Sequence, residues 1–89
     1  MATYIVTFEI NDSTRRKKIK DKLKEYGTYC PIHEHAWAIK TEQKASEIRD
    51  SITPLMISGD RIFIVRSGTE AAWKNAYGTE YSEWLKKHL

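Results

Sequence analysis

Tyr4–Ile10 (YIVTFEI), followed at once by Asn11–Thr14 (NDST), is the stretch that decides the fold. The first segment is rich in aromatic and β-branched residues, which favour an extended strand. Alternate positions along it form one uniformly apolar face: Tyr4, Val6, Phe8 and Ile10. Side chains at alternate strand positions share a face, so we expect this face to pack against helices. The polar cluster that follows is typical of a helix N-terminus, because such side chains accept hydrogen bonds from unpaired backbone amides.

A helix is therefore predicted from this cluster to about Tyr26, with Gly27 just past its end. Ile19, Leu23 and Tyr26 recur at helical spacing and form a narrow apolar stripe. The remaining surface carries seven cations against Asp21 alone: Arg15, Arg16, Lys17, Lys18, Lys20, Lys22 and Lys24. The pattern predicts an amphipathic helix that lies on the sheet and bears a local positive patch.

Two short strands are expected next, over residues 28–32 and 35–40, with Pro31 at an edge or bulge because it lacks an amide donor. A second helix is predicted from Thr41 to about Thr53. Residues 61–66 form a fourth strand, and we expect its apolar run, residues 62–65, to be buried. The order β-α-β-β-α-β predicts an α+β, ferredoxin-like fold with two helices on one face of the sheet.

The C-terminal tail differs from this pattern. Gly68–Glu70 and Gly78–Glu80 repeat a helix-start signal, Thr followed by Glu, so two short helices are expected. Their aromatic rings should be buried: Trp73, Tyr77, Tyr81 and Trp84. We therefore expect one domain over residues 1–89, with a ferredoxin-like core at about 3–66 and a helical tail at about 69–88.

Length and composition limit the class of protein. A chain of 89 residues, 40% hydrophobic and 30% charged, suits one small globular core. Its single cysteine, Cys30, has no internal disulfide partner, which predicts a reducing compartment. No apolar run approaches the roughly 20 residues that cross a bilayer. These features predict a cytoplasmic protein with no membrane contact.

The basic helix carries the first candidate site. Arg15, Arg16 and Lys20 are the candidate nucleic-acid-binding residues, because cations along one helix can neutralise successive phosphates. The net charge of +3 agrees with an acidic partner. The alternative is a solvated helix face that keeps a small protein soluble.

Glu9 is the candidate catalytic and metal-binding carboxylate, since it ends the first strand on the face that the two helices leave open. A monomer would leave Glu9 solvated, whereas two copies packed face to face would bring it to its symmetry mate. Two carboxylates can share Mg²⁺ or Mn²⁺. Ile5 and Thr7 on the same face favour a homodimer. His33–His35 (HEH) offers metal-ligand types but no second cluster, and Cys30 is expected to be a small core residue.

A family resemblance rests on residues in the first third of the chain and in the fourth strand: Val6–Ile10, Asp12, Arg15–Arg16, Lys18–Ile19, Leu23, Tyr26–Gly27 and Asp60–Val65. These resemble the small CRISPR-associated protein of the spacer-acquisition complex, over about residues 3–66. The resemblance implies a ferredoxin-like homodimer that binds duplex nucleic acid beside an integrase partner, with metal-dependent nuclease activity in some members. Ribonuclease toxins of the virulence-associated protein D type have a related fold. Glu9 stands where the family has Asp, and a Trp-rich tail replaces its C-terminal strand.

We therefore expect a dimeric CRISPR-associated-like protein, or a stand-alone relative, that binds DNA or RNA. Its endonuclease activity is left open. The alternative is a non-catalytic ferredoxin-like module that binds a protein through its Trp-rich tail. Salt-dependent binding to DNA or RNA separates the two, because phosphate contacts weaken steeply with salt.

Overall fold

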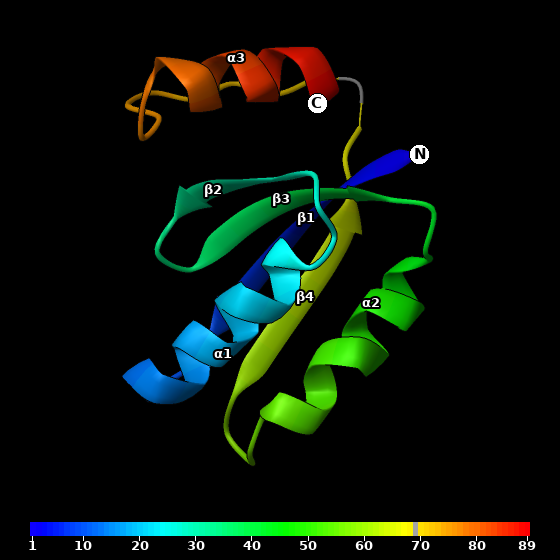
Figure 1. Ribbon diagram of the computed structural model, residues 1–89, viewed down its shortest axis with the longest axis vertical. Helices are drawn as coiled ribbons and strands as arrows, with labels where there is room; N and C mark the ends of the chain where they lie inside the picture. Colours follow the sequence, from blue (N-terminus) through cyan, green and yellow to red (C-terminus); the bar gives the residue numbers. More distant parts are fainter. Residues whose placement is uncertain (69) are drawn as a thin grey trace.

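The computed structural model describes residues 1–68 and 70–89, which form one antiparallel sheet with helices on both faces (Figure 1). The strands are β1 (Ala2–Glu9), β2 (Tyr29–His33), β3 (Ala36–Thr41) and β4 (Arg61–Arg66), in the spatial order β2-β3-β1-β4. The helices are α1 (Ser13–Lys24), α2 (Ala45–Ile52), the short 3-10 helix η1 (Thr53–Leu55) and α3 (Thr79–His88). This order confirms the α+β, ferredoxin-like prediction, with α3 as the helical C-terminal addition.

The main core lies between the sheet and the layer of α1 and α2. Ile19 and Leu23 of α1 are fully buried, as their helical spacing predicts, and Ile48 and Ile52 of α2 are fully buried beside them. The buried hydrophobic residues that β1 and its end contribute to this core are Tyr4, Val6, Phe8 and Ile10. Burying one such aliphatic side chain stabilises the fold by about 1.5–3 kcal/mol. The same burial holds α1 in place, so the cations of α1 must face outward or sideways.

Helix α3 covers part of the opposite face. Ile5, Ala38 and Cys30 lie side by side across β1, β3 and β2, and Leu85 of α3 packs against this row. Trp73, Tyr81 and Trp84 are partly buried in the same cluster. The tail therefore occupies the β2–β3 side of the face that the sequence predicts to be open.

Strand β4 is less buried than its apolar sequence predicts. It lies at the edge of the sheet with β1 as its one neighbouring strand, and α3 does not reach it. Phe63 is 64% exposed, and Val65, which lies beside the covered Ile5, is also exposed. The prediction of a buried fourth strand is wrong on this face, because the layer that would cover it stops at β1.

Element ends differ from the predictions where longer-range contacts compete with local signals. Helix α1 ends at Lys24, two residues early, and Gly27 turns the chain at a φ of +82°. Helix α2 begins at Ala45 because Thr41 pairs with β1. Residues 70–78 form no helix, and Asn75 has a left-handed φ of +61° that a helix cannot contain. Tyr77 is exposed rather than buried, and Thr69, the predicted first tail cap, lies outside the described residues.

No helix in the described parts of the chain has the length and apolar character to cross a membrane.

Candidate functional site

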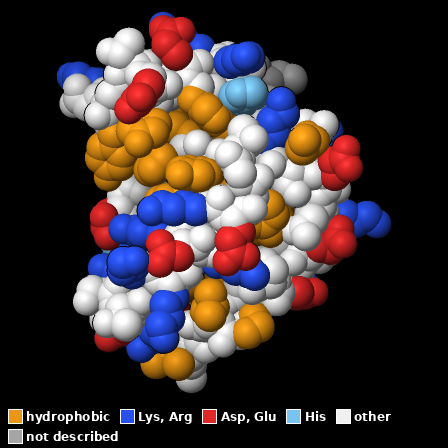
Figure 2. Space-filling view, in the orientation of Figure 1, with side chains coloured by type: hydrophobic (Ala, Val, Ile, Leu, Met, Phe, Trp, Pro, Cys, Tyr) orange, Lys and Arg blue, Asp and Glu red, His pale blue; other side chains and the backbone are white. Residues whose placement is uncertain are grey.

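The outer surface of α1 mixes cations with carboxylates. Six of its seven Lys and Arg residues form ion pairs with five carboxylates: Asp12, Asp21, Glu25, Glu34 and Asp60. Asp21 and Glu34 each contact two cations, and Lys18 has no ion-pair partner within residues 1–68 and 70–89. Blue and red atoms alternate over this part of the surface in Figure 2. The helix therefore keeps a positive excess, smaller than its sequence alone indicates.

Arg15 faces the start of β4 rather than solvent. Its Nε and Nη2 donate to the two carboxylate oxygens of Asp60 at 3.0 and 3.1 Å, and the Asp60 side chain is only 2% exposed. The hydrogen bond to Asp60 raises the pKa of Arg15, and the same bond lowers the pKa of Asp60. The neighbouring Asp12 caps α1 by accepting the backbone N–H of Arg15 at 2.8 Å. Of the three predicted binding residues, Arg15 is thus the one most engaged in the fold.

Arg16 and Lys20 lie together, because residues four apart share one side of a helix. Lys20 Nζ donates to Oε1 of Glu34, and Arg16 Nε lies 4.0 Å from the same oxygen. The hydrogen bond from Lys20, and then the positive charge of the same side chain, lower the pKa of Glu34, with a smaller effect from Arg16. Glu34 stands in the turn between β2 and β3, where the sequence suggested metal-ligand types instead. No local signal indicated this pairing, since it depends on the turn lying over α1.

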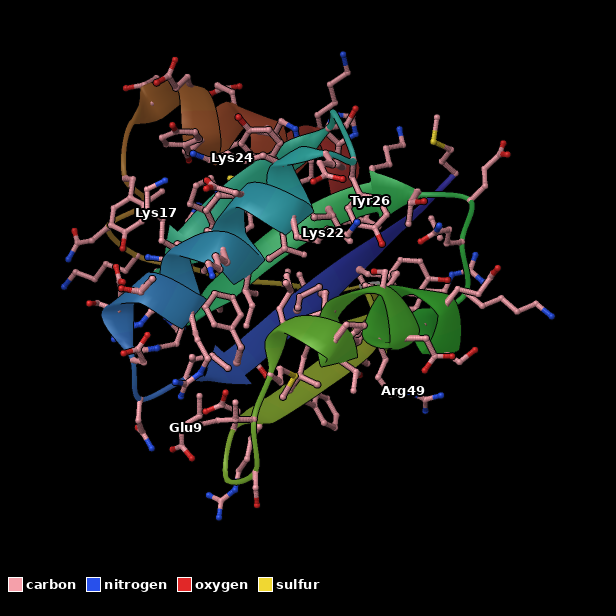
Figure 3. All side chains as sticks on the ribbon, turned by 60° about the horizontal axis from the view of Figure 1, so that its bottom comes forward. Glu9, Lys17, Lys22, Lys24, Tyr26 and Arg49 are labelled. Atoms are coloured by element: carbon pink, nitrogen blue, oxygen red, sulfur yellow. The ribbon has the colours of Figure 1, made fainter. Side chains whose placement is uncertain are left out.

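Among the cations of α1 that form ion pairs, Lys17 and Lys24 are the most exposed. Lys17 Nζ is 3.0 Å from Asp21, and Lys24 Nζ is 3.9 Å from the same carboxylate. Figure 3 shows Lys17 and Lys24 on α1, well separated from Glu9 at the end of β1. Exposed ion pairs of this kind stabilise a protein by about 0–1 kcal/mol, so a phosphate can readily replace their carboxylate. Glu9 and the exposed cations Lys17 and Lys24 therefore lie on different parts of the surface.

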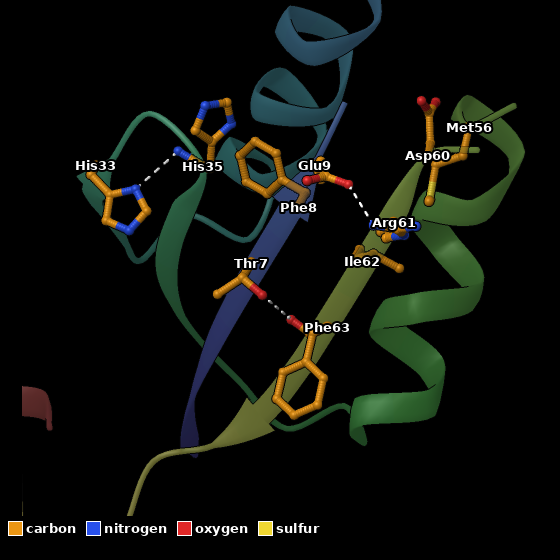
Figure 4. A pocket seen from close by; sticks show the side chains of 10 residues that line it. All are labelled: Thr7, Phe8, Glu9, His33, His35, Met56, Asp60, Arg61, Ile62 and Phe63. Carbon is orange, nitrogen blue, oxygen red and sulfur yellow. Dashed lines mark hydrogen bonds and ion pairs between the residues drawn. The ribbon is translucent and has the colours of Figure 1, made fainter. Parts of the chain in front are cut away.

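Glu9 lines a shallow groove of about 680 Å³ at one end of the sheet (Figure 4). Its Oε1 accepts a hydrogen bond from Arg61 Nη1 at 3.0 Å, and both side chains are exposed. His33 and His35 lie on the other side of the groove, where His33 Nδ1 accepts the backbone N–H of His35 at 3.2 Å. Phe63 and Thr7 form its floor along the sheet, joined by a bond from Thr7 Oγ1 to the carbonyl of Phe63.

The residues of one chain do not fit a divalent cation at Glu9. Mg²⁺ and Mn²⁺ need several oxygen ligands, whereas Glu9 is one carboxylate beside the positive Arg61. Within the described residues, no three His, Cys, Asp or Glu side chains are grouped so that they could hold a metal ion. A metal at Glu9 would need ligands from a second copy.

Cys30 is fully buried beneath α3, and its Sγ donates to the carbonyl of Tyr81 at 3.7 Å. Burial raises the pKa of this thiol, which keeps it protonated and unreactive. Cys30 is therefore a core residue of the second cluster, as the sequence predicts.

The fold has a counterpart among solved structures. The crystal structure of a hypothetical protein, TT1823, from Thermus thermophilus superimposes on this chain with a TM-score of 0.70 and 23% sequence identity. The match covers 84% of this chain and 92% of that chain. No protein-family model and no curated protein matches the sequence.

Proposed function

We propose that this chain binds nucleic acid through the exposed cations of α1 and that it acts as a homodimer, like the small CRISPR-associated proteins that it resembles. One observation supports the proposal: α1 has seven cations and only five carboxylates near them, which leaves an excess of positive charge. Because the ion pairs of Lys17 and Lys24 with Asp21 are exposed, phosphate groups can exchange with that carboxylate at small cost.

The dimensions of α1 support a nucleic-acid ligand. A helix of 12 residues is about 18 Å long, which matches about five nucleotide steps of one strand at about 3.4 Å each. Lys17 and Lys24, seven residues apart, are separated by about 10 Å along the axis. Several phosphates of one backbone can therefore contact the helix at once, which favours a polymeric anion over a small one.

The protein-interaction alternative has weaker support. Its key residues, the tail aromatics Trp73, Tyr81 and Trp84, are partly buried against this chain's own sheet. That packing leaves less of the tail for a partner protein. An integrase partner and endonuclease activity stay predictions from the family resemblance. The resemblance also leaves both DNA and RNA as ligands to be tested.

Fluorescence anisotropy with labelled duplex DNA and RNA at about 50 mM and 200 mM salt tests the proposal. The triple variant Lys17→Gln, Lys18→Gln, Lys24→Gln should weaken binding and lower the salt slope by about one for each lysine that contacts phosphate. The control triple variant, Lys74→Gln, Lys86→Gln, Lys87→Gln, makes the same charge change on the tail. An equal loss in both triple variants, or no binding by the wild type at the lower salt, would reject the proposal.

A further inference from the structure

Arg16 holds a buried hydrogen-bond donor that lacks an acceptor. Its Nε is the one buried side-chain nitrogen or oxygen without a hydrogen-bond partner in the described part of the chain. The nearest carboxylate oxygen, Oε1 of Glu34, is 4.0 Å away, which is too far for a hydrogen bond. An unpaired buried donor is costly and uncommon in native proteins, and a donor of this kind can be satisfied by a bound ion.

The groups around this donor leave a positive excess. Arg16 and Lys20 are two cations that share the single carboxylate of Glu34, and both approach the same oxygen. The side chains of Arg16 and Lys20 are only 21% and 23% exposed, whereas that of Glu34 is 55% exposed. His33 and His35 flank Glu34 in the turn and add no negative charge. The cluster therefore consists of two little-exposed cations that share one more exposed carboxylate.

We propose that Arg16 and Lys20 form a binding site for a nucleic-acid phosphate and that Glu34 occupies this site in the free protein as an internal competitor. This inference rests on the proposed function. It adds the position of one bound phosphate and a way in which Glu34 regulates nucleic-acid binding. The two non-bridging oxygens of a phosphodiester can accept separately from Arg16 Nε and Lys20 Nζ, which a single carboxylate oxygen does not achieve here.

Glu34 is suited to leave the site. Its side chain makes no hydrogen bond beyond the one from Lys20 in residues 1–68 and 70–89, and it stands in a tight turn at the surface. Its displacement therefore breaks contacts to Arg16 and Lys20 alone. A phosphate that enters regains both contacts and also satisfies the unpaired Nε–H.

The first experiment removes the competitor. Glu34→Gln keeps the shape of the side chain and removes its charge, and we expect it to bind a labelled oligonucleotide about three- to fivefold more tightly at the same salt. Glu83→Gln is the matched control, because Glu83 is an exposed carboxylate that pairs with Lys86 on α3. In an Arg16→Gln, Lys20→Gln background, Glu34→Gln should lose most of its effect, because both cations that contact Glu34 are then absent.

A second measurement follows the donor itself and separates two phosphate sources. In wild-type protein and in Glu34→Gln, the Arg16 Nε–H signal is followed by NMR during titration with inorganic phosphate and with the oligonucleotide. We expect a shift with the oligonucleotide that is larger in Glu34→Gln. A shift with inorganic phosphate alone would overturn the nucleic-acid assignment in favour of a small-anion site.

The two proposals fail in different ways. Equal gains in affinity for Glu34→Gln and Glu83→Gln would overturn the competitor role while nucleic-acid binding through α1 stands. No oligonucleotide binding by the wild type or either variant at low salt would reject the proposed function and the inference with it.

Discussion

Arg15 of α1 and Asp60, the residue before β4, form a two-point ion pair across 45 residues of sequence. Arg15 Nε lies 3.0 Å from Oδ2 and Nη2 lies 3.1 Å from Oδ1, while Oδ2 also accepts the backbone N–H of Ile57 at 3.1 Å. Two-point contacts between arginine and carboxylate are stronger and more directional than single ones. The pair ties the first helix to the turn that enters the edge strand, so we assign Arg15 mainly to the fold.

Stability should fall in acid because of this pair. The hydrogen bond from Arg15, and then that from Ile57, hold the pKa of Asp60 below its ordinary value near 3.8. A carboxyl group with a lowered folded pKa stabilises the protein above its unfolded pKa, and this stability is lost as the pH falls through the folded value. We expect the thermal unfolding midpoint, followed by circular dichroism, to drop below about pH 4.

Asp60→Asn should lower that midpoint at neutral pH and flatten its dependence on pH in the acid range. Asp50→Asn is the matched control, because Asp50 is an exposed carboxylate that pairs with its neighbour Arg49. A pH profile of Asp60→Asn that parallels the wild type would show that other carboxyl groups cause the acid loss.

The packing of α3 on the sheet can be measured through Cys30. Leu85 is buried against Cys30 and Ala38, so Leu85→Ala removes the main anchor of the helix. We expect the free energy of unfolding to fall by about 2–5 kcal/mol, or by less if α3 detaches while the rest of the protein stays folded. We also expect iodoacetamide to alkylate the Cys30 thiol faster. Ile48→Val, which weakens the other core, should leave alkylation slow under native conditions. Equal acceleration in both variants would mean that Cys30 is reached only through global unfolding.

We expect the homodimer interface to include the face of β4 that α3 leaves uncovered. Ile5 lies under the tail, whereas Phe63 and Val65 stay exposed beside it. We expect light scattering at micromolar concentration to give about twice the 10.4 kDa chain mass, and Phe63→Asp to give a monomer. Tyr77→Asp is the control, since Tyr77 is similarly exposed but lies in the tail. A wild-type monomer would remove the symmetric Glu9 pair and its metal site.

Cleavage of DNA or RNA in the presence of Mg²⁺ or Mn²⁺ is expected to require Glu9. Glu9→Gln keeps the side-chain shape but loses the anionic ligand, so metal-dependent cleavage should fall to background in a gel assay. Glu42→Gln, an exposed carboxylate change outside the groove, should cleave like the wild type. Cleavage that persists in Glu9→Gln would place the active site elsewhere. Wild-type binding without cleavage would indicate a structural role in holding nucleic acid.

The sequence by itself determined the order of elements and the main core. Alternation at Tyr4, Val6 and Phe8 and helical spacing at Ile19 and Leu23 are local patterns, and the structure confirms the faces that they predict. Such patterns act over a few residues, so they do not depend on where the chain returns. Element ends were less predictable, because Thr41 is drawn into β3 by pairing with β1.

Only the tertiary structure decided which charges and apolar residues face solvent. Asp60 reaches Arg15, and Glu34 reaches Lys20, from 45 and 14 residues away, so no local pattern predicts which cations of α1 are already engaged. Likewise, the apolar sequence of residues 62–65 predicts a buried strand. The sheet order places this strand at an edge that α3 does not cover. The physical reason is that burial and ion pairing depend on neighbours brought together by the sheet, whereas strand and helix preferences are properties of adjacent residues.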